Sequence, residues 1–237
     1  MKASHSSADW IEDAKRRAGL EAIKHVKNGH IIGLGSGSTA AYAIQEIGRL
    51  IRKKKWQVLG VPTSYQAFLL AVDCGIQATT LEEHPKMDIT IDGADQIDPD
   101  LNMIKGMGGA LAREKIVASV SEREVIVADE TKLVKKLGTN HPVPVEVLPS
   151  ATIVAMSRIR EFGGKPVLRA GTGKVGPVVT DNGNFILDVS MKRIDDPRKL
   201  DLDLKHIPGV VETGLFIDLA DVVYVGTRDS VKRLDKK

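Results

Sequence analysis

Residues 30–39 read HIIGLGSGST, and this stretch decides the fold. Residues 30–34 are an apolar run of strand length, and residues 35–39 form a loop of glycine and hydroxyl residues. A helix is predicted from there to about residue 51. Open α/β sheets bind ligands at the carboxyl ends of their strands, so the loop is expected at a ligand-binding edge.

The same alternation of helices and short apolar strands continues on both sides of this stretch. A helix with apolar positions at three- and four-residue steps precedes it, and Asn28-Gly29 ends that helix. Further strands are expected at residues 57–61, 76–79, 87–91 and 124–128, with a helix at 64–73. The predicted fold class is α/β, with an open, mostly parallel sheet and helices on both faces.

A smaller module is predicted after residue 139, where prolines punctuate the chain. A strand at 143–147, a hairpin across Asp181-Asn182-Gly183 and a helix after Asp196-Pro197 indicate an α+β order. The expected organisation is a small α+β domain, which is a candidate oligomer interface, and a catalytic α/β domain. Their predicted bounds are 140–207 for the small domain, and 1–139 with 208–237 for the catalytic one.

Composition excludes several classes of function. The chain of 237 residues is 42% apolar, but it has no apolar run of membrane-spanning length. Residues 1–5 lack the apolar core of a signal peptide, so a cytoplasmic location is expected. A net charge of +3 and an aromatic content of 4% are too low to indicate nucleic acid as a partner. The basic residues 232–237 are expected to be a solvated tail. The six histidines show no zinc spacing, and we predict no metal.

The segment from Lys105 to Lys115 is a glycine-rich turn that continues into a helix. Glycines allow the backbone to approach a ligand closely and to direct N–H groups at it. Glu114 lies on the same arc of this helix as Ala110 and Leu111, so it can point inward and is a candidate base. The alternative is that Glu114 belongs to an exposed Arg-Glu-Lys cluster.

The two other polar stretches also leave alternatives open. The loop at 35–39 is not a dinucleotide fingerprint, because Ser38 stands where the third glycine is required, and no Lys-Ser/Thr pair follows as in a Walker loop. It is either an oxyanion cradle or a tight turn capped by Ser38. Asp92 and Asp95 follow a predicted strand, and they are turn residues, calcium ligands or carboxylates that hold sugar hydroxyls.

Six motifs in order along nearly the whole chain resemble ribose-5-phosphate isomerase type A. They begin at Gly35, Asp92, Lys105, Asp129, Pro144 and Ile207 and read GSGST, DGAD, KGMG with REK, DETK, PVEV and IPGVVE. The resemblance implies a cofactor-free and metal-free aldose–ketose isomerase, which interconverts ribose 5-phosphate and ribulose 5-phosphate through an enediolate. It also implies a homodimer or homotetramer.

The resemblance implies site residues position by position. It places the base at Glu114, with Asp92, Asp95 and Lys105 as further catalytic residues. Lys15, on the first helix, is expected to help Lys132 compensate the phosphate charge. The implied substrate contacts are Ser36, Gly37, Ser38, Thr39, Asp92, Gly93, Ala94, Asp95, Lys105, Gly106, Met107, Gly108 and Lys132.

The sequence departs from the family pattern at three positions. Gln96 stands where the family usually has Glu, Met107 interrupts a glycine triplet, and Ser36 often appears as Thr. Gln96 removes a charge beside the acids and Met107 adds bulk to the loop, so substrate affinity or loop mobility is expected to differ.

Two other functions fit this architecture. One is a sugar-phosphate sensor resembling the effector domain of certain bacterial transcription regulators, although residues 1–30 hold a single predicted helix and no helix-turn-helix. The other is acyl transfer through a glutamyl thioester, as in coenzyme A transferases, for which fold-level analogy is the only basis.

Overall fold

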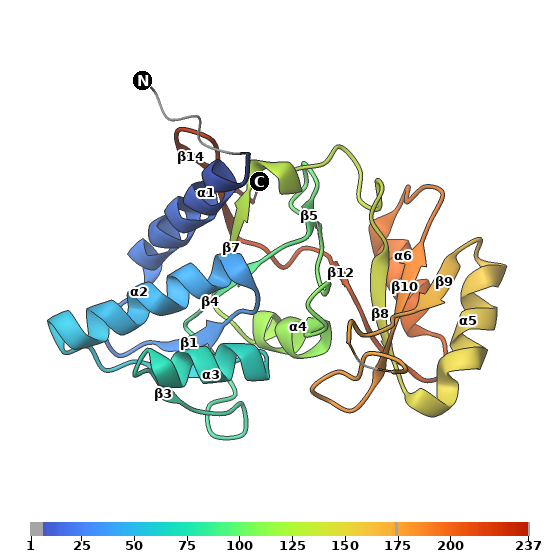
Figure 1. The fold of residues 1–237 in the computed structure, drawn as a ribbon, viewed down its shortest axis with the longest axis horizontal. Coiled ribbons are helices and arrows are strands. Elements are labelled where there is room, and N and C mark those ends of the chain that lie inside the picture. The colour runs from blue at the N-terminus through green and yellow to red at the C-terminus, as the bar shows by residue number, and fades with distance from the viewer. Residues whose placement is uncertain (1–6, 174, 237) are drawn as a thin grey trace. The chain divides into compact units, whose positions relative to one another are not determined.

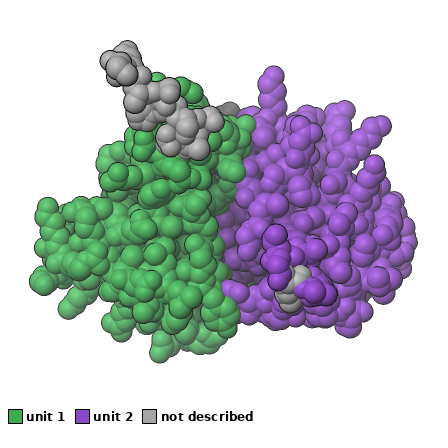
Figure 2. Space-filling view, in the orientation of Figure 1, with its two compact units in different colours: residues 1–94, 116–133, 219–237 green, residues 95–115, 134–218 purple. Residues whose placement is uncertain are grey.

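The computed structural model describes residues 7–173 and 175–236 (Figure 1). The chain forms two compact units (Figure 2). Unit 1 comprises residues 1–94, 116–133 and 219–237, and unit 2 comprises residues 95–115 and 134–218. Residues 1–5, which entered the prediction of location, lie outside the described residues. Within the described ranges, no helix has the length and apolar character needed to cross a membrane.

Unit 1 is built on a seven-stranded sheet in the order β14-β13-β7-β4-β1-β2-β3. All neighbouring strands are parallel except β13 and β14, so the predicted open and mostly parallel sheet is confirmed. The strands are β1 (Ile31–Leu34), β2 (Leu59–Pro62), β3 (Gln77–Ala78), β4 (Ile89–Gly93), β7 (Glu124–Asp129), β13 (Val222–Gly226) and β14 (Val231–Asp235).

Helices cover both faces of this sheet. Successive side chains of a strand point to opposite faces, so its apolar strands present apolar side chains on both sides. Ile32 and Leu34 of β1 share one core with α1 (Ser7–Ala22), η1 (Ile23–His25), α2 (Ser38–Lys54) and α3 (Tyr65–Asp73). Gly33 faces the other side, where a Cβ would lie 2.5 Å from a methyl group of Val117 on α4 (Leu111–Ser119). On the first face α1 packs beside α2 and against β7 and β13.

Unit 2 contains two antiparallel sheets. The larger has the order β11-β8-β10-β9 and packs around a core shared with α5 (Thr152–Glu161) and α6 (Pro197–Lys205). Its strands are β8 (Val143–Val147), β9 (Lys165–Leu168), β10 (Phe185–Ser190) and β11 (Val210–Thr213), and η3 (Pro149–Ala151) precedes α5. The smaller sheet has the order β12-β6-β5, with β5 (Gln96–Ile97), β6 (Met103–Ile104) and β12 (Leu215–Phe216).

The two units differ from the predicted domain bounds. Residues 95–115 belong to unit 2, and so do residues 208–218, because β11 pairs with β8 and β12 pairs with β6. Strands of two residues have no measurable periodicity, and their pairing joins segments distant in sequence, so the pattern could not reveal them. The prediction of a tail at 232–237 was also wrong, because β14 pairs with β13 across residues 231–235.

Candidate functional site

In unit 1, the loop after β1 is joined to Asp92 at the end of β4. The Ser36 N–H donates to Asp92 Oδ1 at 3.0 Å, and the Gly93 N–H donates to the same oxygen at 2.7 Å. A Cβ at Gly35 would lie 2.2 Å from that oxygen, so this position requires glycine. Asp92 is only 1% exposed. The structure therefore brings two of the predicted stretches together at the carboxyl ends of neighbouring strands.

The amino terminus of α2 lies at this same loop and carries a nearby cation. Gly37 precedes the helix with φ at 91°, and Gly37 and Ser38 are exposed while Thr39 is half-buried. Lys15 Nζ lies 3.2 Å from Ser38 Oγ and 2.7 Å from a Glu12 carboxylate oxygen. Hydrogen bonds from Lys15 and Tyr42 lower the pKa of Glu12. A helix amino terminus beside a lysine favours binding of an anion such as a phosphate.

Lys132 lies just beyond the carboxyl end of β7, the neighbour of β4. The strand ends at Asp129, whose buried carboxylate accepts a hydrogen bond from the Thr131 N–H at 3.0 Å. This contact caps the short helix η2 (Glu130–Lys132), and Lys132 is half-buried. β1, β4 and β7 are neighbours in a parallel sheet, whose strands share one carboxyl edge, so the predicted site residues at the end of β4 and those that follow β1 and β7 lie along the same edge.

In unit 2, Lys105 and Glu114 form a buried ion pair. Lys105 Nζ lies 3.4 Å from Glu114 Oε2, and the two residues are 2% and 5% exposed. The Lys105 ammonium also lies 5.2 Å from the centroid of the Phe216 ring, a favourable cation–π distance. The alternative of an exposed Arg-Glu-Lys cluster was therefore wrong. Glu114 is a buried carboxylate in the first turn of α4, beside a cation.

The loop between Lys105 and α4 depends on glycine and on Asp95. Gly106 and Gly109 have φ values of 101° and 81°, which other residues rarely adopt. The Met107 N–H donates to Asp95 Oδ2 at 3.0 Å. Met107 and Gly108 are exposed, so this loop is open to a ligand, and Asp95 fixes its backbone.

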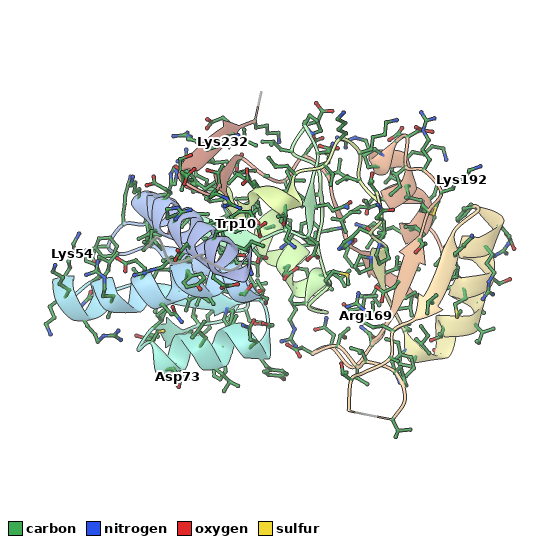
Figure 3. All side chains as sticks on the ribbon, turned by 45° about the horizontal axis from the view of Figure 1, so that its top comes forward. Trp10, Lys54, Asp73, Arg169, Lys192 and Lys232 are labelled. Atoms are coloured by element: carbon green, nitrogen blue, oxygen red, sulfur yellow. The ribbon has the colours of Figure 1, made fainter. Side chains whose placement is uncertain are left out.

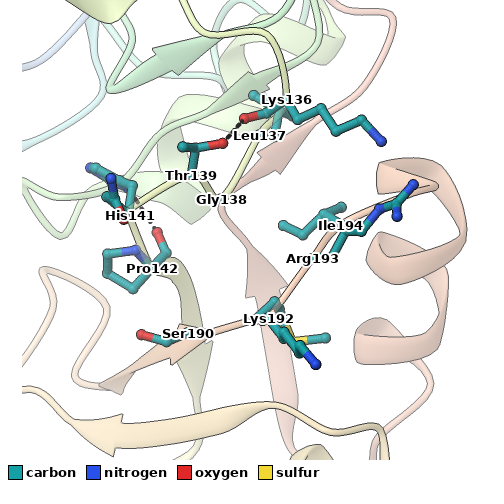
Figure 4. Close-up of a pocket in the computed structure, with 12 residues that line it drawn as sticks. Lys136, Leu137, Gly138, Thr139, His141, Pro142, Ser190, Lys192, Arg193 and Ile194 are labelled. Atoms are coloured by element: carbon teal, nitrogen blue, oxygen red, sulfur yellow. Dashed lines mark hydrogen bonds between the residues drawn. The ribbon is translucent and has the colours of Figure 1, made fainter.

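Gln96 links the next segment to a different part of unit 2. Its amide N–H₂ donates to the Thr139 carbonyl, and its amide oxygen accepts from the Gly138 N–H, each at 2.8 Å. Residues 136–142 and 190–194 line a cavity of about 430 Å³ (Figure 4). Because none of the predicted site residues lines this cavity, we do not assign it to the site.

The described residues contain no metal-binding cluster: across 7–173 and 175–236, no three His, Cys, Asp or Glu side chains gather closely enough to hold an ion. Two lysines lie beside predicted site residues. Lys15 lies at the α2 terminus and Lys105 at Glu114.

Sequence reasoning missed two kinds of residue near these loops. Phe216 was not considered, although its ring contacts Lys105, because it belongs to a two-residue strand with no pattern of its own. Arg169 and its partner Asp188 were missed because the contact of Arg169 with the Lys105–Gly109 loop spans more than sixty positions. Only a long-range covariation signal could have indicated them.

Comparison with known proteins places the chain in a family. The model of ribose 5-phosphate isomerase A (phosphoriboisomerase A) matches residues 59–230. Ribose-5-phosphate isomerase A of Methanosarcina acetivorans is 51% identical over 234 residues, which cover 99% of this chain and 98% of that protein. The protein of the same name from Pyrococcus abyssi is 47% identical, with 95% and 99% covered.

Solved structures agree with the sequence comparison. Ribose 5-phosphate isomerase A of Methanocaldococcus jannaschii superposes with a TM-score of 0.92 at 49% identity, covering 95% of this chain and 99% of that one. A D-ribose-5-phosphate isomerase in complex with phospho-erythronic acid gives 0.93 at 45% identity, with the same shares covered. Sequence and fold therefore match over nearly the whole length of this chain and of each of these relatives, and this chain belongs to the ribose 5-phosphate isomerase A family.

Proposed function

We propose that this chain interconverts ribose 5-phosphate and ribulose 5-phosphate. The observation that carries the proposal is the buried pair of Lys105 and Glu114, 3.4 Å apart, at the start of a helix that follows an open glycine loop. Proton transfer between two adjacent carbons needs one carboxylate that reaches both, and a positioned cation stabilises the negative charge that forms. Membership of the family supports the choice of substrate.

In this proposal Glu114 is the general base. It takes the proton from C2 of the open-chain aldose, and the C–H electrons form the C1–C2 double bond of the enediolate while O1 gains negative charge. Glu114 then returns the proton to C1, and a proton passes from O2 to O1, which leaves the ketose. The Lys105 ammonium stabilises the enediolate oxygen, as preorganised donors do in other enolising enzymes.

The other predicted residues are assigned to substrate binding. Asp92 and Asp95 hold sugar hydroxyls and assist ring opening, and the backbone of Gly93, Ala94, Gly106, Met107 and Gly108 contributes contacts. The phosphate is assigned to Ser36, Gly37, Ser38 and Thr39, with Lys15 and Lys132 compensating its charge. The contact of Lys15 with Ser38 supports this assignment.

The proposed reaction uses no cofactor and no metal, and a cytoplasmic location is part of the proposal. The lysines supply the positive charge that a metal ion would otherwise provide. Turnover of ribose 5-phosphate is therefore expected to continue in excess EDTA. A complete loss of activity that added metal reverses would overturn the metal-free mechanism.

Glu114→Gln tests the function most directly. Glutamine keeps the size of the side chain but accepts no proton at neutral pH, so kcat should fall by about 10²–10⁴. Affinity for phospho-erythronic acid, measured by calorimetry, should remain within a few-fold of the parent. A variant with near-parental kcat would remove Glu114 from the mechanism and make Asp92 the next candidate base.

A further inference from the structure

Arg169 directly follows β9 (Figure 3). A carboxylate holds its guanidinium in one orientation. Its Nε donates to Asp188 Oδ2 at 2.9 Å, and its Nη2 donates to Asp188 Oδ1. Such a two-point contact fixes the plane of the guanidinium as a single hydrogen bond cannot. The Arg169 side chain is 12% exposed and that of Asp188 is 22% exposed, so the pair is largely screened from water.

The remaining nitrogen of this guanidinium holds the glycine loop. Arg169 Nη1 donates to the carbonyls of Gly106 at 3.1 Å and Met107 at 2.9 Å. Nη2 lies 3.8 Å from Met107 Sδ. Two consecutive carbonyls of the loop therefore point at one cation, and Asp188 keeps that cation in place.

One peptide unit of the loop is held from both ends. The Gly106 carbonyl accepts from Arg169, and the Met107 N–H of the same peptide donates to Asp95. In the next peptide the Met107 carbonyl faces Arg169. Because the C=O and N–H of a trans peptide point in opposite directions, the Gly108 N–H faces away from Arg169. The guanidinium also polarises this peptide and makes its N–H a better donor.

We propose that Arg169 is a positioning residue, which sets the direction of the Gly108 N–H and the place of Lys105 through the loop backbone. This inference rests on the proposed function, in which the loop binds substrate. The loop needs an external support, because its glycines lack side chains that could pack and the Met107 side chain is exposed. Asp188 acts through Arg169 and does not contact the loop in any of the hydrogen bonds described.

The experiment compares Arg169→Lys with Asp188→Asn in the full-length protein. Lysine keeps the charge but cannot bond a carboxylate at two points and two carbonyls at once, so kcat/KM for ribose 5-phosphate should fall by about 100-fold, mostly in kcat. Asp188→Asn keeps the guanidinium but loosens its orientation and should give a smaller loss. The matched control is Arg193→Ala, which removes an exposed arginine paired with Asp195 in the same unit and should leave kcat/KM unchanged.

Two measurements separate positioning from general destabilisation. Hydrogen exchange of the Met107 and Gly108 amides should accelerate at least about tenfold in Arg169→Lys, while the core amides of β8 and β10 keep their parental rates. In Arg169→Ala, millimolar guanidinium should restore part of kcat, and methylammonium should restore less because it lacks the planar fork.

Parental exchange at residues 107–108 in Arg169→Lys would overturn the inference, and so would a kcat/KM within twofold of the parent. A parent protein without isomerase activity would instead overturn the proposed function. Exchange of the loop amides and calorimetric binding of phospho-erythronic acid would still report whether Arg169 holds the loop, so the two failures are distinguishable.

Discussion

Gln96 uses both halves of its amide to tie two segments of unit 2 together. The amide donates to Thr139 and accepts from Gly138, and the side chain is 6% exposed. A glutamate carboxylate at this position could still accept from the Gly138 N–H, but it has no N–H to donate to the Thr139 carbonyl. Its negative charge would instead face the negative end of that carbonyl. The residue that departs from the family pattern is therefore fitted to its surroundings, and its consequence is structural before it is electrostatic.

Gln96→Glu is accordingly expected to destabilise the protein by about 1–3 kcal/mol near neutral pH, because a buried acceptor loses its donor and a charge is buried. The loss should shrink under acidic conditions, where a protonated carboxyl can donate to Thr139. Urea unfolding near neutral pH and under acidic conditions measures this loss of stability. Gln77→Glu, at an exposed position of β3, is the matched control and should change little. Equal effects at both positions would show that the amide contacts contribute nothing.

At the scale of elements, α1 supplies a side chain to the amino terminus of α2. Lys15 donates to Ser38 and to Glu12, and the Glu12 carboxylate accepts a second hydrogen bond from the Tyr42 hydroxyl. The contact lets a helix that precedes the first strand contribute charge to the loop after that strand.

Lys15→Ala should raise KM for ribose 5-phosphate by about tenfold with a smaller change in kcat, because a charge-assisted contact to phosphate is worth on the order of 1.5 kcal/mol. Steady-state kinetics at low and high salt measure this, and the difference should narrow at high salt. Lys24→Ala is the control, since Lys24 pairs with Glu21 at the same spacing and is 69% exposed. A KM equal to that of the parent would exclude Lys15 from phosphate binding.

A second link between elements joins α4, α6 and β11. Lys115 Nζ lies 2.8 Å from a Glu212 oxygen and 3.4 Å from Asp201 Oδ1. Burial alone would raise the pKa of Glu212. The charge and hydrogen bond of Lys115, together with hydrogen bonds from the Thr213 backbone and Lys205, outweigh burial and lower this pKa. Folding therefore favours the ionised form of the Glu212 carboxyl group.

A lowered carboxylate pKa stabilises the fold above the ordinary value of 4.5, and this stability is lost as pH falls through the lowered pKa. Glu212→Gln should therefore cost stability between neutral pH and 4.5, and its difference from the parent should shrink as the pH falls further through the lowered pKa. Urea unfolding across this range measures the difference, with Glu161→Gln, whose partner Arg158 is exposed, as control. A difference independent of pH would exclude the ion pair as its source.

At the scale of the whole molecule, unit 2 exposes large apolar side chains on α5 and β9. Ile153 is 76% exposed, Val154 53% and Val167 63%. We propose that this small α+β region, predicted as an interface, joins copies of the chain in a homodimer or homotetramer.

Light scattering should therefore give two or four times the mass of one chain. Ile153→Glu combined with Val167→Glu should lower that mass, because both substitutions place a charge in the proposed contact. Tyr65→Glu is the control, since this side chain of unit 1 is also exposed, at 59%. A parent with the mass of one chain at working concentration would refute the assembly.

The sequence predicted the parallel sheet well, because each of its central strands is a continuous apolar run bounded by glycine or polar residues. The starts of α3 and α6 were also predicted, at residue 64 and after Asp196-Pro197, and in the structure Ser64 and Asp196 cap these helices, since each side chain accepts from a backbone N–H three residues later. Short strands such as β6 and β12 were not, because their pairing depends on contacts between distant segments. The family resemblance named the loop residues of the candidate site, but not the Arg169 and Asp188 pair that holds one of those loops.

The strand order of unit 1 has a consequence for synthesis. β13 lies between β7 and β14, and α1 packs against both β7 and β13. While the chain emerges from the ribosome, the edge of β7 that β13 later covers has no partner strand until residues 222–226 have appeared. An open β-strand edge is a site of aggregation. A chain halted at residue 218 should therefore bind chaperones, whereas one released after residue 236 can close its sheet.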